Sequence, residues 1–235
     1  MSDEDKSGYP RSNLEEPEDW EFEPDQRPRW SPLARAPKIL SLRPAVWWVS
    51  GWVLFSFMYW RHPREWDYSV SQKWVFEDGE LWRLVTALLV HSDLGHLLSN
   101  CYLFLIFGWM LRDYYGSRAF PWASVAVGAL TNLIVVYTYP INVRLLGASG
   151  QVFGMIGMWL VLYIRFEDVV SLGRRILFSV GFCLVLLVPS VYQPQTSYRA
   201  HAIGFVLGVL AGWLLIVTGT KVIEKDVTSD STLLH

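Results

Sequence analysis

The stretch LLGASGQVFGMIG, from Leu145 to Gly157, places a serine among glycines where an apolar helix is expected to begin. A serine can start a helix as its N-cap by accepting a hydrogen bond from a backbone N–H, so one interpretation of Ser149 is a cap. Capping does not require Gly147 and Gly150 beside the serine. Glycine allows another part of the chain to approach closely, which is a second interpretation of the pattern.

The composition indicates a chain that folds in a lipid bilayer. Of its 235 residues, 52% are hydrophobic and 15% are aromatic, which is too apolar for an ordinary soluble domain. The formal net charge of -2 and the dispersed lysines and arginines exclude a broad basic surface, so no nucleic-acid partner is expected. Cys101 and Cys183 lie within apolar runs and are expected to be buried thiols.

Three regions are predicted along the chain. Residues 1–44 are acidic and contain several prolines, which is typical of a disordered tail, and residues 220–235 form a short C-terminal tail. Between them, residues 45–219 are expected to form an all-α membrane domain of six transmembrane helices, each near the length that crosses a bilayer. The expected spans are 45–60, 94–111, 120–139, 147–164, 176–192 and 200–218.

The positive charges predict the orientation of this domain. Lysines and arginines recur in the loops on the side of the termini, whereas the two short loops on the other side carry only Arg144 and Arg199. Because positive residues favour the cytoplasmic side, both termini are expected in the cytoplasm. The long polar and aromatic connection at 61–93 then lies on the outer side, where part of it could rest in the membrane interface.

Polar side chains gather at one depth of the predicted bundle. His96 and Ser149 lie equally far before the arginine that ends each of their spans, and His201 opens the last span near the same level. Asn100 follows His96 by four residues and shares its helix face. A single polar residue in a membrane helix often serves only helix packing. Four at one depth are costly in lipid and favour a functional site.

Two stripes of small residues predict that the fourth and sixth spans touch. The stripes are Gly150, Gly154 and Gly157 on one helix and Gly204, Gly208 and Gly212 on the other. Ser149 and His201 head the two stripes, so close backbone approach would bring a hydroxyl and an imidazole together. Plain helix packing is the other interpretation of these glycines.

This arrangement predicts nucleophilic catalysis. His201 can take the proton of the Ser149 hydroxyl as a general base. No predicted span contains Asp or Glu, so packing is expected to orient the base, with Phe153 as the ring that stacks on it. The Ser149 backbone N–H, the Asn100 amide and a His96 ring N–H could stabilise a developing oxyanion.

The motifs resemble those of the rhomboid intramembrane serine proteases. Residues 147–150 (GASG) are similar to the family's GxSG motif, residues 96–100 (HLLSN) to HxxxN, and residues 200–208 (AHAIGFVLG) to AHxxGxxxG. Trp82 and Arg83 match the Trp-Arg pair of the family's first loop, and His91 matches a further family histidine. The resemblance covers about residues 80–212, with the motifs in order and on the expected helices.

The resemblance implies an endopeptidase that uses a Ser-His dyad, without cofactor or metal, to cut transmembrane segments of membrane proteins near their outer end. It also implies water access from the outer side and a movable fifth helix. The absence of a family pattern before Ala45 and of a seventh span suggests the basic six-helix prokaryotic type, in a bacterial inner membrane. The alternative is a catalytically inactive relative that binds membrane clients. A haem protein ligated by His96 and His201, or a polar-lined transporter, would not require a serine between glycines.

Overall fold

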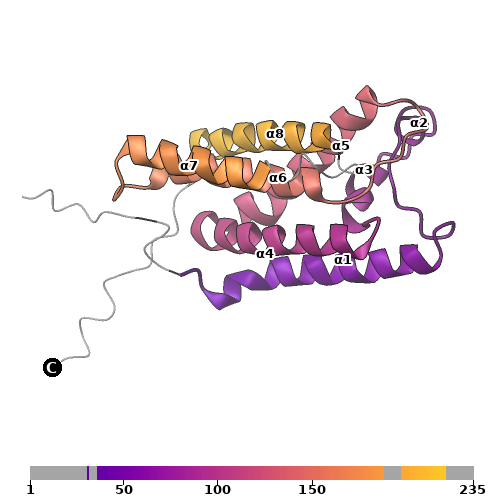
Figure 1. Ribbon diagram of the computed structural model, residues 1–235, viewed down its shortest axis with the longest axis horizontal. Helices are drawn as coiled ribbons and strands as arrows, with labels where there is room; N and C mark the ends of the chain where they lie inside the picture. Colours follow the sequence, from indigo (N-terminus) through magenta and orange to yellow (C-terminus); the bar gives the residue numbers. More distant parts are fainter. Residues whose placement is uncertain (1–30, 32–35, 188–196, 221–235) are drawn as a thin grey trace, which may run out of the picture.

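The structure is a computed structural model that describes residues 31, 36–187 and 197–220, and these residues are mostly helical (Figure 1). Its six long helices are α1 (Arg43–Arg61), α4 (Leu94–Ser117), α5 (Ser124–Thr138), α6 (Ser149–Phe166), α7 (Leu172–Leu187) and α8 (Tyr198–Val217). The short element η1 (Ile39–Leu42) precedes α1. Between α1 and α4 lie α2 (Gln72–Phe76), α3 (Arg83–Thr86) and η2 (Ala87–Leu89), and η3 (Arg118–Ala123) connects α4 to α5. Each predicted span overlaps one long helix, and the last residues of the predicted span 176–192 lie outside the described residues.

The predicted fold class, an all-helical polytopic membrane bundle, is confirmed. Among the described residues, three continuous helical stretches are long and apolar enough to cross a membrane: Leu94–Thr138, Ser149–Phe166 and Tyr198–Val217. The first of them contains α4, η3 and α5, and it reverses near Gly116, which has a φ of 80°. Such a φ is accessible to glycine, which allows the chain to leave α4 and turn into α5.

The long helices run roughly along the long axis of the molecule, and the connections split between its two ends (Figure 1). At one end lie α2, α3 and the starts of α4, α6 and α8, so these three helices run in the same direction, as predicted. At the other end, the Arg118 guanidinium reaches the end of α8 by donating to Thr218 Oγ1 at 2.8 Å. The polar residues that open α4, α6 and α8 therefore share one end of the bundle.

The predicted glycine contact between α6 and α8 is confirmed, and it is the most extensive contact between any two described elements. A Cβ atom added to Gly204 would overlap the backbone of Gly150, and one added to Gly208 would overlap the backbone of Gly154. At Gly212 it would lie 2.9 Å from the Met158 carbonyl oxygen. These contacts are made by backbone atoms, so there is no flexible side chain that could move aside.

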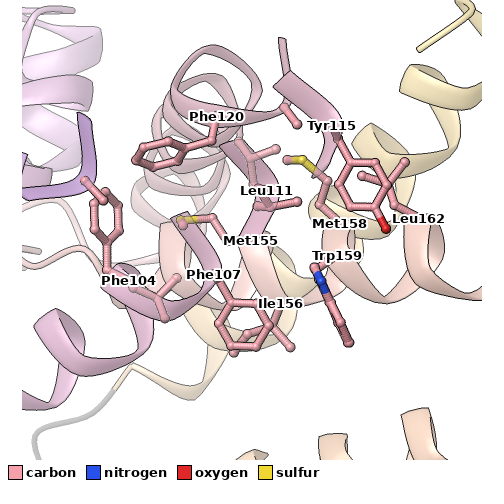
Figure 2. Close-up of a cluster of buried hydrophobic side chains, with 14 of the residues drawn as sticks. Phe104, Phe107, Leu111, Tyr115, Phe120, Met155, Ile156, Met158, Trp159 and Leu162 are labelled. Atoms are coloured by element: carbon pink, nitrogen blue, oxygen red, sulfur yellow. The ribbon is translucent and has the colours of Figure 1, made fainter. Parts of the chain in front are cut away.

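The opposite face of α6 packs differently, through large side chains that it shares with α4 and η3 (Figure 2). Met155 and Ile156 of α6 are almost completely buried there, as are Phe107 and Leu111 of α4. The Trp159 and Tyr163 rings continue this cluster and stack on each other with a centroid distance of 5.0 Å. Side-chain packing therefore holds α6 against α4.

The N-terminal region differs from the prediction in its last residues. The predicted tail ends at residue 44, but η1 begins at Ile39 and α1 at Arg43. Two hydrogen bonds hold this part against α4: Ser41 Oγ donates to Asp113 Oδ1 at 2.7 Å, and Trp109 Nε1 donates to the Lys38 carbonyl at 2.7 Å. Cys101 is a buried free thiol, as expected. Most of the predicted tails, and the side chain of Cys183, lie outside the described residues.

Candidate active site

Ser149 is the first residue of α6, and the interpretation of this serine as the N-cap is wrong. The cap is Ala148, which makes no side-chain capping bond. Because Ser149 already belongs to the helix, its hydroxyl is not placed to cap the first turn. The residue is partly buried, and among the described residues no hydrogen bond is made by its Oγ. Its hydroxyl is therefore not committed to a structural contact in this part of the chain.

Gly147 explains how α4 reaches the start of α6. Its φ of 110° favours glycine, and a Cβ at this position would lie 2.8 Å from His96 Nε2. The Gly147 N–H donates to the Ala87 carbonyl at 2.9 Å, which fixes the loop before Ser149. The absence of a side chain at Gly147 thus allows the His96 imidazole to lie against the turn that leads to Ser149.

His201 lies in the first turn of α8 and is only 6% exposed. Its ring stacks on the Phe153 ring, with centroids 4.0 Å apart and planes inclined by 12°. This is the contact that the sequence predicted, although its role in orienting a base stays a prediction. Within the described residues, neither ring nitrogen of His201 has a hydrogen-bond partner. A buried imidazole without a polar partner is available for proton transfer.

Backbone contacts bring the neighbours of Ser149 and His201 together. A Cβ at Gly150 would lie 3.3 Å from the carbonyl oxygen of Ala200. The residue after Ser149 therefore touches the residue before His201. No hydrogen bond joins the Ser149 hydroxyl to the His201 ring in the described structure, so a shift of a side chain would be needed to form one. Catalytic hydrogen bonds are often long in structures without substrate.

The other predicted donors come from α4. Asn100 is 5% exposed, and its Nδ2 has no partner among the residues described. His96 lies one turn earlier, and its Nδ1 is 3.1 Å from Ser92 Oγ, which leaves Nε2 directed at the turn around Gly147. An unpartnered amide and an imidazole on one helix face are suited to donate to a negative oxygen.

His91 belongs to the packing behind His96. It is fully buried, with its ring 5.1 Å from the His96 ring and 4.9 Å from the Trp52 ring. The Ser56 hydroxyl accepts from the His91 backbone N–H at 3.1 Å and lies 3.4 Å from Nδ1. Burial lowers the pKa of His91 to about 3, and the nearby His96 contributes to the shift. His91 is therefore neutral and supports the position of His96.

Trp82 and Arg83 make their contacts within the first loop, and not with the proposed dyad. The Arg83 guanidinium pairs with Glu80, donates to the Ser69 carbonyl at 3.0 Å, and lies 4.5 Å from the centroid of the Trp82 ring. In the described part of the chain, no hydrogen bond or ring contact joins either residue to Ser149 or His201.

Sequence reasoning missed the contacts that join this loop to the segment before Ser149. Val70 and Leu145 form an isolated antiparallel bridge with two backbone hydrogen bonds of 2.8 Å. Arg144 pairs with Asp67 at 2.7 Å, and its guanidinium carbon lies 5.0 Å from the centroid of the Trp74 ring. No local pattern indicates such pairs, because their partners are far apart in the sequence and are not set by a helical repeat.

Comparison with known proteins supports the family resemblance that the motifs indicated. The rhomboid domain family matches residues 78–218, which is more than half of the chain. The chain belongs to the rhomboid family. YdcA of Bacillus subtilis, a candidate rhomboid protease, is 25% identical over 180 residues, which cover 76% of this chain and 86% of YdcA. The rhomboid protease GlpG of Haemophilus influenzae is 27% identical over 145 residues, 59% of this chain and 71% of GlpG.

A third relative comes from Toxoplasma gondii. Rhomboid-like protease 2 of Toxoplasma gondii is 29% identical over 137 residues, 58% of this chain. The match spans 48% of that relative, so about half of the Toxoplasma protein has no counterpart in this comparison. The rhomboid domain at residues 78–218, together with the apolar helices among the described residues, makes this chain an integral membrane protein of the rhomboid fold.

Proposed function

We propose that this rhomboid family chain is an intramembrane serine endopeptidase, with Ser149 as nucleophile and His201 as general base. The observation that carries the proposal is the buried His201 ring, stacked on Phe153 and free of polar partners among the described residues, at the head of the α6–α8 glycine contact. That contact puts the residue after Ser149 against the residue before His201. The protease names of YdcA and GlpG support the same reaction.

The proposed reaction proceeds by acyl transfer. His201 takes the proton of Ser149 Oγ as the oxygen attacks the carbonyl carbon of the scissile peptide bond. The tetrahedral intermediate collapses when His201 returns this proton to the leaving amine, and an acyl-enzyme ester at Ser149 remains. His201 then takes a proton from water, whose oxygen attacks the ester, and the proton passes to Ser149 as the new carboxyl end leaves.

Three groups would stabilise the negative oxygen of each intermediate. They are the backbone N–H of Ser149, the Nδ2 of Asn100 and the Nε2–H of His96. Two of them come from one face of α4, and Gly147 allows the His96 ring to approach the start of α6. Donors that are already in place when charge develops are typically the largest single contribution to catalysis.

The substrates in this proposal are transmembrane segments of other membrane proteins, cut near their outer end. Ser149 opens α6 at the end of the bundle that holds the long connection between α1 and α4. The charge distribution supports placing this end on the outer side of a bacterial inner membrane, with both termini in the cytoplasm. A tag at either terminus should therefore resist protease added to right-side-out vesicles.

The test is cleavage of several transmembrane substrates by the purified, membrane-reconstituted protein. Wild type should release a product, and Ser149→Ala and His201→Ala should each abolish cleavage while retaining the helical circular dichroism of the wild type. Matched controls are Ser50→Ala and His62→Ala, because both residues are exposed and lie outside the proposed site. Cleavage by Ser149→Ala would contradict the proposal. Binding of these substrates by a wild type that never cuts them would favour the inactive, client-binding alternative.

A further inference from the structure

The first turn of α8 is fastened to the end of α5 by residues outside the family motifs. The hydroxyl of Tyr139, the C-cap of α5, lies 2.8 Å from Ser197 Oγ. From the other side, Arg199 Nη1 donates to the carbonyl of Thr138 at 3.1 Å. The Arg199 guanidinium carbon also lies 5.2 Å from the centroid of the Tyr139 ring. We refer to Tyr139, Ser197 and Arg199 as the α5–α8 clamp.

Ser197 connects this clamp to His201. It is the N-cap of α8, and its Oγ accepts from the Ala200 N–H at 3.2 Å. Its carbonyl oxygen accepts from the backbone N–H of His201, also at 3.2 Å. A serine hydroxyl has one proton and two lone pairs, so Ser197 can cap the helix and still share a hydrogen bond with Tyr139. The clamp thus includes Ser197, the residue to which the His201 backbone N–H donates its hydrogen bond.

The position of His201 depends strongly on this first turn. No hydrogen bond in the described residues fixes its ring, and the Phe153 stack controls the plane of the ring more than its height along α8. The glycine contact with α6 reaches this turn only at the Ala200 carbonyl, and the positions where an added Cβ would overlap the backbone of α6 begin at Gly204, almost one turn further into α8. Helix ends fray because their first N–H groups lack partners within the helix. A second contact, in addition to the one at Ala200, would therefore hold the turn that carries His201 more firmly.

We propose that the α5–α8 clamp is this second contact, and that Tyr139 is a positioning residue for the general base. The inference rests on the proposed dyad. The Tyr139 hydroxyl contacts the side chain of Ser197, the N-cap of α8, and the Ser197 carbonyl accepts from the His201 backbone N–H. Arg199 packs against the Tyr139 ring. Loss of the hydroxyl lets the first turn shift, which misplaces the imidazole relative to Ser149 without removing any group that reacts.

Tyr139→Phe tests the proposal because it removes one hydroxyl and keeps the ring that Arg199 covers. We expect kcat for a transmembrane substrate to fall about tenfold, since small misplacements of reacting groups are costly, while KM stays within about twofold. Labelling of Ser149 by a soluble fluorophosphonate should slow by the same factor. Tyr137→Phe is the matched control: Tyr137 is 70% exposed on the same helix, and its variant should behave as wild type.

Variants of Ser197 separate positioning from general stability. If Tyr139 acts through Ser197, the double variant Tyr139→Phe with Ser197→Ala should be as slow as Ser197→Ala alone. Ser197→Thr keeps both the cap and the hydroxyl, so it should restore most of the rate. Should Tyr139→Phe not fold, Arg199→Gln, at an exposed position, should lower kcat in the same direction.

The outcomes distinguish the clamp from the dyad. Wild-type rates in Tyr139→Phe, or additive losses in the double variant, would overturn the clamp and leave the protease proposal intact. A change in KM without a change in kcat or labelling rate would also overturn it. A wild type that neither cuts nor labels would overturn both proposals.

Discussion

Helix α6 packs through two contrasting faces. Toward α8 it presents glycines, and backbone meets backbone along the stripes that begin at Gly150 and Gly204. Toward α4 it presents Met155 and Ile156, which lie among aromatic rings (Figure 2). A side-chain interface can adjust by changing rotamers, whereas a backbone interface has no such freedom. The proposed dyad is built on the face that cannot adjust, which suggests that the glycine contact sets the geometry of Ser149 and His201.

The most damaging change should be Gly208→Ala. The added methyl would overlap the backbone of Gly154, so α6 and α8 must separate. We expect a loss of about 3 kcal/mol in the free energy of unfolding and about a hundredfold loss of cleavage. Gly181→Ala in α7 is the control, because a Cβ there meets no atom within 4 Å. It should raise stability by about 0.5–1 kcal/mol. Equal behaviour of the two variants in reconstituted cleavage and unfolding assays would remove the distinction between the faces.

Asn100→Ala separates chemistry from packing on the α4 side. Nδ2 of Asn100 has no partner among the described residues, so its removal leaves no other group unpaired there. Turnover should fall about a hundredfold, as for the loss of one oxyanion donor, while the free energy of unfolding changes little. A variant that cuts at the wild-type rate would exclude Asn100 from the site.

The packing around His91 predicts how stability depends on pH. The pKa of His91 falls from 6.5 to about 3 on burial, so between these values the unfolded chain binds a proton that the folded chain does not. This contribution to stability is complete above pH 6.5 and is lost as the pH falls toward 3, by several kcal/mol in total. Unfolding in mixed micelles should show the loss, and His91→Asn should flatten it. An unchanged slope in that variant would assign the effect to other groups. His62→Asn, at an exposed position, should keep the wild-type slope.

The smallest effect should come from the side-chain face of α6. Met155 is fully buried, and Met155→Leu conserves the volume of the core. We expect a loss of less than about 1.5 kcal/mol in the free energy of unfolding and cleavage within about twofold of wild type. A loss of cleavage as large as that of Gly208→Ala, in a protein that is still folded, would show that the side-chain face also sets the dyad.

The sequence predicted the helices and their contact well because both follow a local repeat. Apolar runs placed all six long helices, and the glycine stripes identified the face that α6 turns to α8. Phe153 was predicted to stack on the base from its helical spacing alone. The N-cap at Ala148 was missed because serine is the commoner cap. The sequence also does not show at which residue the turn at Gly147 ends and the helix begins.

The parts that sequence did not predict depend on distant partners. The Val70–Leu145 bridge and the Asp67–Arg144 pair join segments that no local pattern connects. The contact between Tyr139 and Ser197 could not be predicted either. In the sequence Tyr139 is an ordinary helix end and Ser197 an ordinary cap, and only the packing of α5 against α8 brings them together. The same reason explains why a regular structure around Lys38 and Ser41 was not expected: hydrogen bonds to α4 hold these residues.

The central claim is that Ser149 is a nucleophile activated by His201, and the most direct measurement is the site and rate of fluorophosphonate labelling. Detergent-purified wild type, Ser149→Ala, His201→Ala and the control Ser50→Ala would be labelled in parallel and the modified peptide identified by mass spectrometry. The account predicts a single modification at Ser149 in wild type and Ser50→Ala, and none in the other two, because a hydroxyl without a base stays weakly nucleophilic. Equal labelling of Ser149 in His201→Ala, or labelling of a different serine in wild type, would contradict it.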